Sequence, residues 1–309
     1  MRLRCEVTGM WAGHDEEDRP LSADPVGLVA IDLDGTLLRS DGSICAPSAE
    51  AIVDAAEKGV KIVLASGRSP QSMLPIYNAL GLNTWMIAHN GAMIVDPVTR
   101  QVILNETMAS PIARQTVEIA RGVAPSVAVG VYAGDRCYTD TVRSRARKAA
   151  LATVGAEVGT GEGDAGIIAG TEELAAPAGT LGDVLDQPVT KVMFVGESDV
   201  LGGIQMALQS RLAEQIEFAF SDLRLLQVVR RGVDKATAVQ RAAEHYGISR
   251  QGVMTIGDAP NDIGMLRWAG MGIALNNAWE EVRRAAHFTC PSNNEAGVAE
   301  AFRKYVAWS

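Results

Sequence analysis

The chain has 309 residues, of which 47% are hydrophobic and 21% charged, a composition typical of folded globular proteins and long enough for more than one average domain. A formal net charge of -9 argues against nucleic acid or an anionic membrane as a partner, because both require a basic field. The charge therefore favours a small-molecule substrate, and nothing in the sequence indicates an obligate protein partner.

The cysteines and the N-terminal segment indicate a cytoplasmic protein. Cys5, Cys45, Cys137 and Cys290 are far apart and form no C-x-x-C pair, which predicts reduced thiols rather than a zinc knuckle or a disulfide framework. No apolar run approaches the ~20 residues of a membrane span, and the start of the chain lacks the apolar stretch of a signal peptide. The stretch 13–25 (GHDEEDRPLSADP) is polar and contains proline, so we expect residues 1–25 to form a flexible extension outside the fold.

From residue 26 onward, short apolar runs alternate with segments of helical spacing, the pattern of β-α-β units around a mostly parallel sheet. The runs 26–31 and 60–65 predict buried strands, and the segment 47–58 between them predicts a crossover helix that ends at Gly59. We expect a doubly wound α/β core. Its other predicted elements are strands 85–88, 253–256 and 272–275, a hairpin of 93–95 with 102–104, and a helix over 235–246.

The middle of the chain has a different texture. Residues 108–222 are predicted to form an inserted α+β lobe, which leaves 26–107 and 223–309 for the core. The stretch 155–187, rich in Gly, Ala, Thr and Pro, fits neither a helical nor a strand pattern. The predicted elements of the lobe are strands 127–132, 192–195 and 217–220 and helices 112–121, 143–152 and 200–211.

Two carboxylates follow the first predicted strand, in the sequence DLDGT. Asp32 and Asp34 emerge at the carboxyl end of that strand, so both can point into one crevice, an arrangement that is costly without a cation. A Mg²⁺ ion would relieve the repulsion and clamp a phosphoryl oxygen, leaving one Asp as nucleophile and the other as general acid. The alternative is that Asp-Gly merely makes a turn after the strand.

Polar groups also follow the second strand and begin a late helix. Ser66-Gly67-Arg68 offers a hydroxyl and backbone N–H groups that can hold phosphate oxygens, although Ser66 could equally serve as a helix cap. Lys235 stands at a helix start, where the helix dipole disfavours a cation, so we expect an anion to face it. The alternative for any single lysine is a solvated surface position.

A second acidic segment, GDAPND at 257–262, ends another buried strand. Asp258 is the natural third anchor for a hard cation that prefers oxygen ligands. A simple turn does not require two acids and an amide, so this segment strengthens the prediction of a metal site.

Seven segments, in order, span the predicted core: DLDGT, ASGRS, HNGA, GVDKATAV, GDAPNDIGML, GIALNNA and FTCPSNNEAGVA. This series resembles the haloacid dehalogenase-like superfamily, specifically its Cof-type branch, subfamily IIB, of sugar-phosphate phosphatases with a large cap. The resemblance implies a Rossmann-like core whose strand ends carry the site, with Mg²⁺ as cofactor. It also implies that the lobe inserted between the Ser66 and Lys235 segments is a cap that selects the substrate.

The resemblance assigns roles to particular residues. It implies that Asp32 is the phosphorylated nucleophile, that Asp34 is the general acid/base, and that Asp32, Asp34 and Asp258 bind the metal with Asp262 supporting the metal shell. The phosphate and substrate contacts that it implies are Thr36, Ser66, Gly67, Arg68, Lys235 and Asn261.

Some positions depart from the family pattern or remain open. Ala236 stands where Gly usually follows the lysine, Asn276 where Gly usually precedes Asn-Ala, and His287 where Asp is usual, which concerns loop geometry rather than the reaction class. His89 could face the substrate or be structural, and His245 is predicted to cap the C-terminal end of a helix.

The expected activity is Mg²⁺-dependent hydrolysis of a small phosphorylated metabolite. A phosphomutase that returns the phosphoryl group to a reoriented sugar and a non-catalytic phosphometabolite-binding protein are the alternatives. The sequence does not identify the substrate, because selectivity is expected to lie in the poorly patterned lobe.

Overall fold

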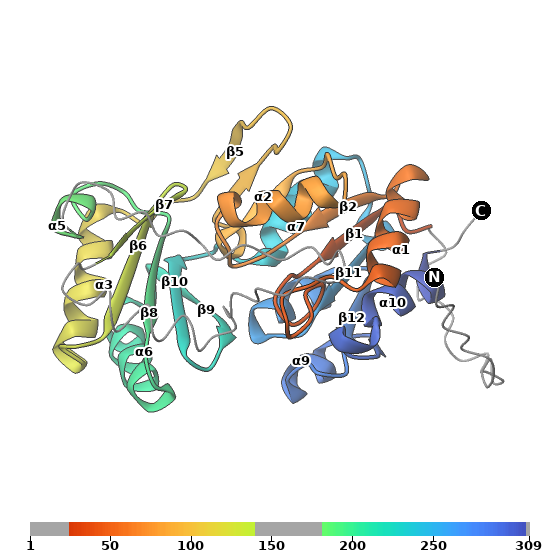
Figure 1. Ribbon diagram of the computed structural model, residues 1–309. Coiled ribbons are helices and arrows are strands. Elements are labelled where there is room, and N and C mark those ends of the chain that lie inside the picture. Colours follow the sequence, from red (N-terminus) through yellow and green to blue (C-terminus); the bar gives the residue numbers. More distant parts are fainter. Residues whose placement is uncertain (1–24, 140–180, 307–309) are drawn as a thin grey trace, which may run out of the picture.

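The computed structural model describes residues 25–139 and 181–306, which form two lobes (Figure 1). One lobe contains the two ends of the described chain, and the other is an insertion within it. The predicted helix 143–152 and all but the last residue of the predicted extension 1–25 lie outside the described residues.

The first lobe, the core, is built on a parallel sheet whose five described strands have the order β13-β12-β11-β1-β2. Because β1 has its sequence neighbour β2 on one side and the distant β11 on the other, the order reverses there, as in doubly wound sheets. The predicted α/β class is confirmed. The strands are β1 (Leu28–Ile31), β2 (Lys61–Leu64), β11 (Val253–Gly257), β12 (Met271–Leu275) and β13 (Phe288–Cys290).

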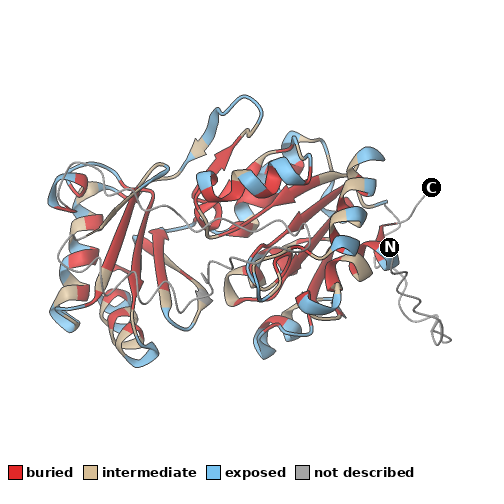
Figure 2. Cartoon of the chain, viewed as in Figure 1, coloured by how far each residue is buried: buried red, intermediate tan, exposed pale blue. Residues whose placement is uncertain are grey.

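Helices cover both faces of this sheet, which is why its strands are continuous apolar runs (Figure 2). Val29 and Ile31 of β1 belong to the cluster that includes α1, α2 and α10, whereas Leu28 and Ala30 pack with α7 and α8 on the other face. The helices of the core are α1 (Ala46–Glu57), α2 (Pro70–Ala79), α7 (Lys235–His245), α8 (Ile263–Trp268), α9 (Glu280–Ala285) and α10 (Gly297–Tyr305).

A small antiparallel sheet extends the core beside β2. The predicted hairpin is present, and a parallel bridge from Ala65 to Ile87 connects its first strand to the main sheet. Its strands are β3 (Met86–Ala88), β4 (Met93–Val95) and β5 (Val102–Asn105). Short 3₁₀ turns are η1 (His89–Gly91), η2 (Arg250–Gly252), η3 (Pro260–Asp262) and η4 (Asn293–Glu295).

The second lobe, the cap, contains an antiparallel sheet with the described order β7-β6-β8-β10-β9. Residues 225–230 were predicted to belong to the core, but they form β10, so the chain returns to the core after Arg230 rather than at residue 223. The described elements of the cap are α3 (Ser110–Val123), β6 (Ala128–Ala133), β7 (Arg136–Thr139), α5 (Leu181–Val184), β8 (Lys191–Val195), α6 (Ser198–Leu212), β9 (Ile216–Asp222) and β10 (Leu225–Arg230).

The two faces of the cap sheet have different neighbours. Side chains that include Val192 and Val228 pack under α3 and α6, as expected for one face of an alternating strand. Lys191 and Gln227 occupy the alternate positions and therefore lie on the opposite face. That face meets the core, because the Lys191 ammonium donates a hydrogen bond to the carbonyl oxygen of Gly67 at 2.7 Å.

Candidate active site

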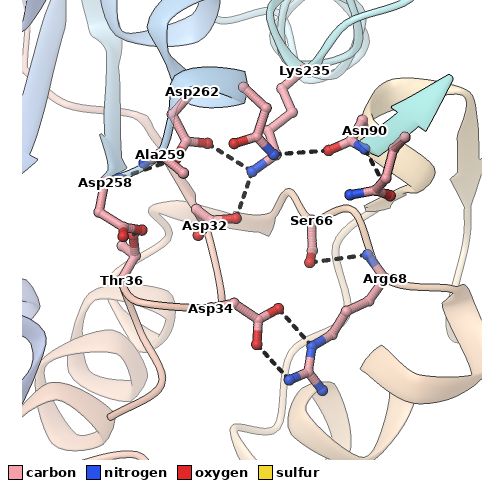
Figure 3. Close-up of polar contacts among 12 residues, drawn as sticks. Asp32, Asp34, Thr36, Ser66, Arg68, Asn90, Lys235, Asp258, Ala259 and Asp262 are labelled. Atoms are coloured by element: carbon pink, nitrogen blue, oxygen red, sulfur yellow. Dashed lines mark hydrogen bonds and ion pairs between the residues drawn. The ribbon is translucent and has the colours of Figure 1, made fainter. Parts of the chain in front are cut away.

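Three strands of the core sheet end at the same edge with a polar residue. Asp32 directly follows β1, Ser66 lies two residues after the end of β2, and Asp258 directly follows β11 (Figure 3). These strands are parallel neighbours, so their carboxyl ends lie side by side, as the sequence predicted.

Lys235 connects two of the carboxylates. Its side chain is fully buried at the start of α7 and donates to Oδ1 of Asp32 at 2.5 Å and to Oδ1 of Asp262 at 2.7 Å. Burial alone would lower the pKa of Lys235, but Asp262 and Asp32 outweigh it and raise that pKa. The anion expected opposite this lysine is therefore a pair of carboxylates.

Three buried carboxylates lie close together, and two of them contact that ammonium. Asp32, Asp258 and Asp262 each offer an oxygen within 4.8 Å of the others. Burial raises the pKa of Asp32 well above its usual value against the attraction of Lys235, and burial together with Asp262 raises the pKa of Asp258 to about 7. Three carboxylates against one ammonium leave surplus negative charge, and oxygen donors of this kind fit a hard divalent cation such as Mg²⁺.

Supporting hydrogen bonds fix this cluster. Asp262 accepts through Oδ2 from the backbone N–H groups of Asp258 at 3.0 Å and Ala259 at 3.1 Å, so both of its oxygens are engaged. The hydroxyl of Thr36 donates to Oδ1 of Asp258 at 2.7 Å. The implied substrate contact Thr36 thus holds a carboxylate in this structure.

Asp34 lies apart from the three clustered carboxylates. The chain leaves strand geometry after Ile31 and turns, so the i, i+2 alternation that would place Asp32 and Asp34 together no longer applies. Asp34 is half exposed and accepts two hydrogen bonds from Arg68, at 2.8 Å from Nε and 2.5 Å from a terminal nitrogen. Ser66, which is buried, accepts from the backbone N–H of Arg68 at 3.2 Å.

A chain of amides links Asn261 to the cap. Nδ2 of Asn261 donates to Oδ1 of Asn90 at 2.9 Å, and Nδ2 of Asn90 donates to Oε1 of Gln227 at 3.2 Å. Lys191 donates to the same Gln227 oxygen at 2.9 Å. The sequence motifs do not include Lys191 or Gln227, and they give no role to Asn90. The signal for the last two is a polar residue within an otherwise apolar strand, in KVMFV and LLQVV.

The three histidines in the described part of the chain have structural contacts. His89 is fully buried against Tyr132 of the cap, with ring centroids 4.8 Å apart. Burial and the nearby Lys191 charge lower its pKa well below the usual value. His245 is the last residue of α7, with its ring stacked 3.7 Å from that of Trp85, and Nδ1 of His287 accepts from a backbone N–H at 2.8 Å.

Comparisons with known proteins agree with this geometry. Residues 29–302 match the family model of haloacid dehalogenase-like hydrolases. The 5-amino-6-(5-phospho-D-ribitylamino)uracil phosphatase YitU of Bacillus subtilis is 26% identical, over 91% of this chain and 97% of its own. No helix within the described residues has the length and apolar character needed to span a membrane.

Solved structures share the architecture. A haloacid dehalogenase-like hydrolase from Bacteroides thetaiotaomicron has a TM-score of 0.70 at 28% identity, covering 90% of this chain and 98% of that one. The subclass IIB sugar phosphatase BT4131 has the same fold, with a TM-score of 0.72 at 20% identity over 89% and 97% of the two chains. The chain therefore belongs to the haloacid dehalogenase-like hydrolases, and its curated relatives in that family identify it as a phosphatase.

Proposed function

We propose that this phosphatase hydrolyses small phosphorylated metabolites, with sugar phosphates as the substrate class, and that Asp32 carries the phosphoryl group between two half-reactions. The supporting observation is the buried Lys235, which donates to Asp32 and Asp262 beside Asp258 at the carboxyl edge of a parallel sheet. A protein that only binds phosphometabolites does not need a nucleophile held in place by a buried ammonium. The wide spacing of the four cysteines, with no C-x-x-C pair, supports a cytoplasmic location as part of this proposal.

Mg²⁺ is the cation proposed for this site. Asp32 and Asp258 would hold it through carboxylate oxygens, and the family pattern adds the main chain of Asp34. Asp262 would support the residues that bind the ion rather than bind it directly, because both of its oxygens already accept hydrogen bonds. When bound, the ion offsets the negative charge of the phosphoryl oxygens.

The protein's own residues carry the proton and phosphoryl steps. An oxygen of Asp32 attacks phosphorus in line as the bond to the alcohol breaks, and Asp34 protonates that alcohol. In the second half-reaction Asp34 takes a proton from water, which attacks the aspartyl-phosphate and releases phosphate. Asp34 is paired with Arg68 at the outset, so it must exchange one of those hydrogen bonds for the substrate.

The remaining residues divide by what they contact. The hydroxyl of Ser66 and the backbone at Gly67 are proposed to hold phosphate oxygens, and Lys235 balances the charge on them. Polar groups that already contact another site residue are proposed to support the site, namely Thr36, Arg68 and Asn261.

The nucleophile can be tested by substitution of a single oxygen. Asp32→Asn should reduce phosphate release by at least about three orders of magnitude while the protein stays folded, because an amide is no nucleophile. Phosphate release is measured over a panel of sugar phosphates with Mg²⁺ restored after chelation. Asp186→Asn is the matched control, because Asp186 is an exposed cap residue paired with Arg114.

Three outcomes would contradict the proposal. Near-wild-type turnover by Asp32→Asn would remove Asp32 from its role. Formation of an isomeric sugar phosphate without free phosphate would identify a mutase. Absence of turnover by the wild-type protein across the panel would favour a binding protein.

A further inference from the structure

The cap contacts the core through two buried polar side chains near the reaction centre. Lys191 on β8 and Gln227 on β10 are each 2% exposed. The Lys191 ammonium donates to the carbonyl of Gly67 and to Oε1 of Gln227, at 2.7 and 2.9 Å. From Gln227 the hydrogen bonds continue into the core, to Asn90 and then Asn261.

Lys191 fixes the direction of each hydrogen bond in the series from Gln227 to Asn261. An ammonium can only donate, so the Gln227 atom shared by Lys191 and Asn90 must be the oxygen. Asn90 must therefore present Nδ2 to Gln227, which leaves its Oδ1 to accept from Nδ2 of Asn261. Reversing any one of these amides would place two donors or two acceptors face to face.

Tight packing holds the amides in place. Asn90 is 1% exposed and has a left-handed backbone, with φ of 58°. A Cβ atom at Gly67 would lie 3.0 Å from Nε2 of Gln227 and 3.2 Å from the side chain of Asn90. The two amides are therefore packed closely against the backbone of Gly67.

This series of hydrogen bonds ends at an acceptor atom that has no donor among the described residues. With Nδ2 of Asn261 held by Asn90, the remaining polar atom is Oδ1, which is buried and accepts no hydrogen bond from any residue that the structure describes. A buried acceptor left without a donor is costly. Asn261 also directly precedes Asp262, the carboxylate that holds Lys235.

We propose that Lys191 and Gln227 are positioning residues that hold the Asn261 carboxamide with Oδ1 as an acceptor for a hydroxyl-type donor of the bound state. This inference rests on the proposed phosphatase function, and the donor is either a hydroxyl of the leaving group or an ordered water. Lys191 and Gln227 belong to the cap, whereas Asn90 and Asn261 belong to the core. The orientation of the Asn261 side chain is therefore set when the cap docks against the core.

A double-mutant cycle tests the connection. Lys191→Met should lower kcat/KM by roughly 3- to 10-fold, the effect of one hydrogen bond, and should cost clearly less in an Asn261→Ala background, where only its bond to Gly67 remains to be lost. The assays use the best sugar phosphate of the panel and p-nitrophenyl phosphate. A loss confined to the sugar phosphate supports a substrate hydroxyl as the donor, and an equal loss on both substrates supports water. Additive losses in the two backgrounds would overturn the proposal.

Conservative variants separate orientation from general packing. Gln227→Glu keeps an oxygen facing both Lys191 and Asn90, so it should retain wild-type kcat/KM, whereas Gln227→Leu should match Lys191→Met. Thr190→Val is the matched control: Thr190 is fully buried next to Lys191 but bonds Asn105 and the backbone of Gly134. Its effect should add to that of Asn261→Ala.

A readout independent of turnover keeps this inference distinct from the proposed function. With ¹⁵N-labelled asparagine, the side-chain NH₂ signal of Asn261 is identified by its absence in Asn261→Ala. That signal should shift in Lys191→Met and in Gln227→Leu and stay in place in Thr190→Val. An unshifted signal in both cap variants would overturn the inference, whether or not the protein releases phosphate.

Discussion

Asp34 and Arg68 form a pair that the proposed reaction must open. The guanidinium of Arg68 makes two parallel hydrogen bonds to Asp34, a geometry that orients the carboxylate strongly. Both groups are partly exposed, so solvent weakens the pair and leaves it exchangeable. In the proposed reaction, Asp34 stays outside the carboxylate cluster, paired with Arg68, until a leaving group is bound.

Replacing this carboxylate should affect substrates according to their leaving group. Asp34→Asn cannot protonate the departing oxygen, so kcat should fall by about 10²-fold or more on sugar phosphates and much less on p-nitrophenyl phosphate, whose leaving group needs little protonation. Steady-state kinetics on the two substrates measure the ratio. Equal losses on both would count against Asp34 as the general acid.

His89 should give the protein a measurable dependence of stability on pH. Its folded-state pKa is lowered by burial and by Lys191, while the unfolded chain titrates near the usual ~6.5. Below about pH 6.5 the unfolded state binds the extra proton, so this residue lowers the free energy of unfolding as pH falls, by at most about 1.4 kcal/mol per pH unit. Above that pH its contribution is constant.

The variant His89→Phe keeps a ring against Tyr132 but cannot titrate. Its free energy of unfolding should therefore decline less than that of the wild type between pH 7.5 and 5.5, as measured by denaturant titration at each pH. The difference between the two proteins isolates His89 from Asp32 and Asp258, whose raised pKa values act in the opposite direction. Parallel stability profiles for the two proteins would contradict the assignment.

At the scale of elements, the turn after β1 is shaped around Asp258. Gly35 has φ of +84°, and a Cβ atom there would lie 2.3 Å from Oδ2 of Asp258. Gly42, in the same connection, has φ of +79° and nothing within 4 Å of its Cβ position. The two glycines share the backbone requirement, but only one of them touches the candidate metal site.

This contrast makes a matched pair of variants. Gly35→Ala and Gly42→Ala should each lose about 1 kcal/mol of stability from left-handed strain, and Gly35→Ala should lose more because of the clash. Gly35→Ala should also raise the Mg²⁺ concentration for half-maximal activity by about 10-fold or more, and Gly42→Ala should leave it unchanged. Similar metal dependence in both variants would show that Asp258 does not bind the ion.

At the scale of the whole molecule, one carboxylate joins both connections between the lobes. Glu106 lies between β5 and α3, where the chain enters the cap. It pairs with Arg230 at the end of β10, where the chain leaves the cap, and with Arg241 of α7 at 3.3 Å. These ion pairs hold the two segments that connect the lobes, called the hinge below, to the core. The arginines are about half exposed, so each pair contributes at most about 1 kcal/mol.

Loosening the hinge should alter turnover in a salt-dependent way. Glu106→Gln is expected to change kcat/KM for sugar phosphates by about 2- to 5-fold at low ionic strength, because the docked cap becomes less favoured. The ratio of variant to wild type should approach one near 1 M salt, where the ion pairs are screened. Glu300→Gln, which breaks a helical pair with Arg303 far from the hinge in sequence, is the control. A ratio independent of salt would exclude an electrostatic role.

The sequence by itself determined the core and the location of its chemistry. Continuous apolar runs indicate strands that are buried on both faces of a sheet. When helices connect such strands, neighbouring strands run parallel. The residues that follow β1, β2 and β11 therefore had to meet at one edge, and Asp32, Ser66 and Asp258 do so. The segment 225–230 was misplaced because its apolar run is equally suited to either sheet, and only pairing with β8 and β9 assigns it to the cap.

Only the tertiary structure decided which polar groups face one another. Lys235 and Asp32 are 203 positions apart in the sequence, and Asn90 and Gln227 are 137 apart, so no local pattern encodes their contact. Periodicity specifies which side of a strand is buried, whereas side-chain partners depend on sheet order and on where the cap docks. For this reason the sequence placed Asp32, the proposed nucleophile, at the sheet edge, while the pairing of Asp34 with Arg68 and the link from Lys191 to Asn261 came from the fold.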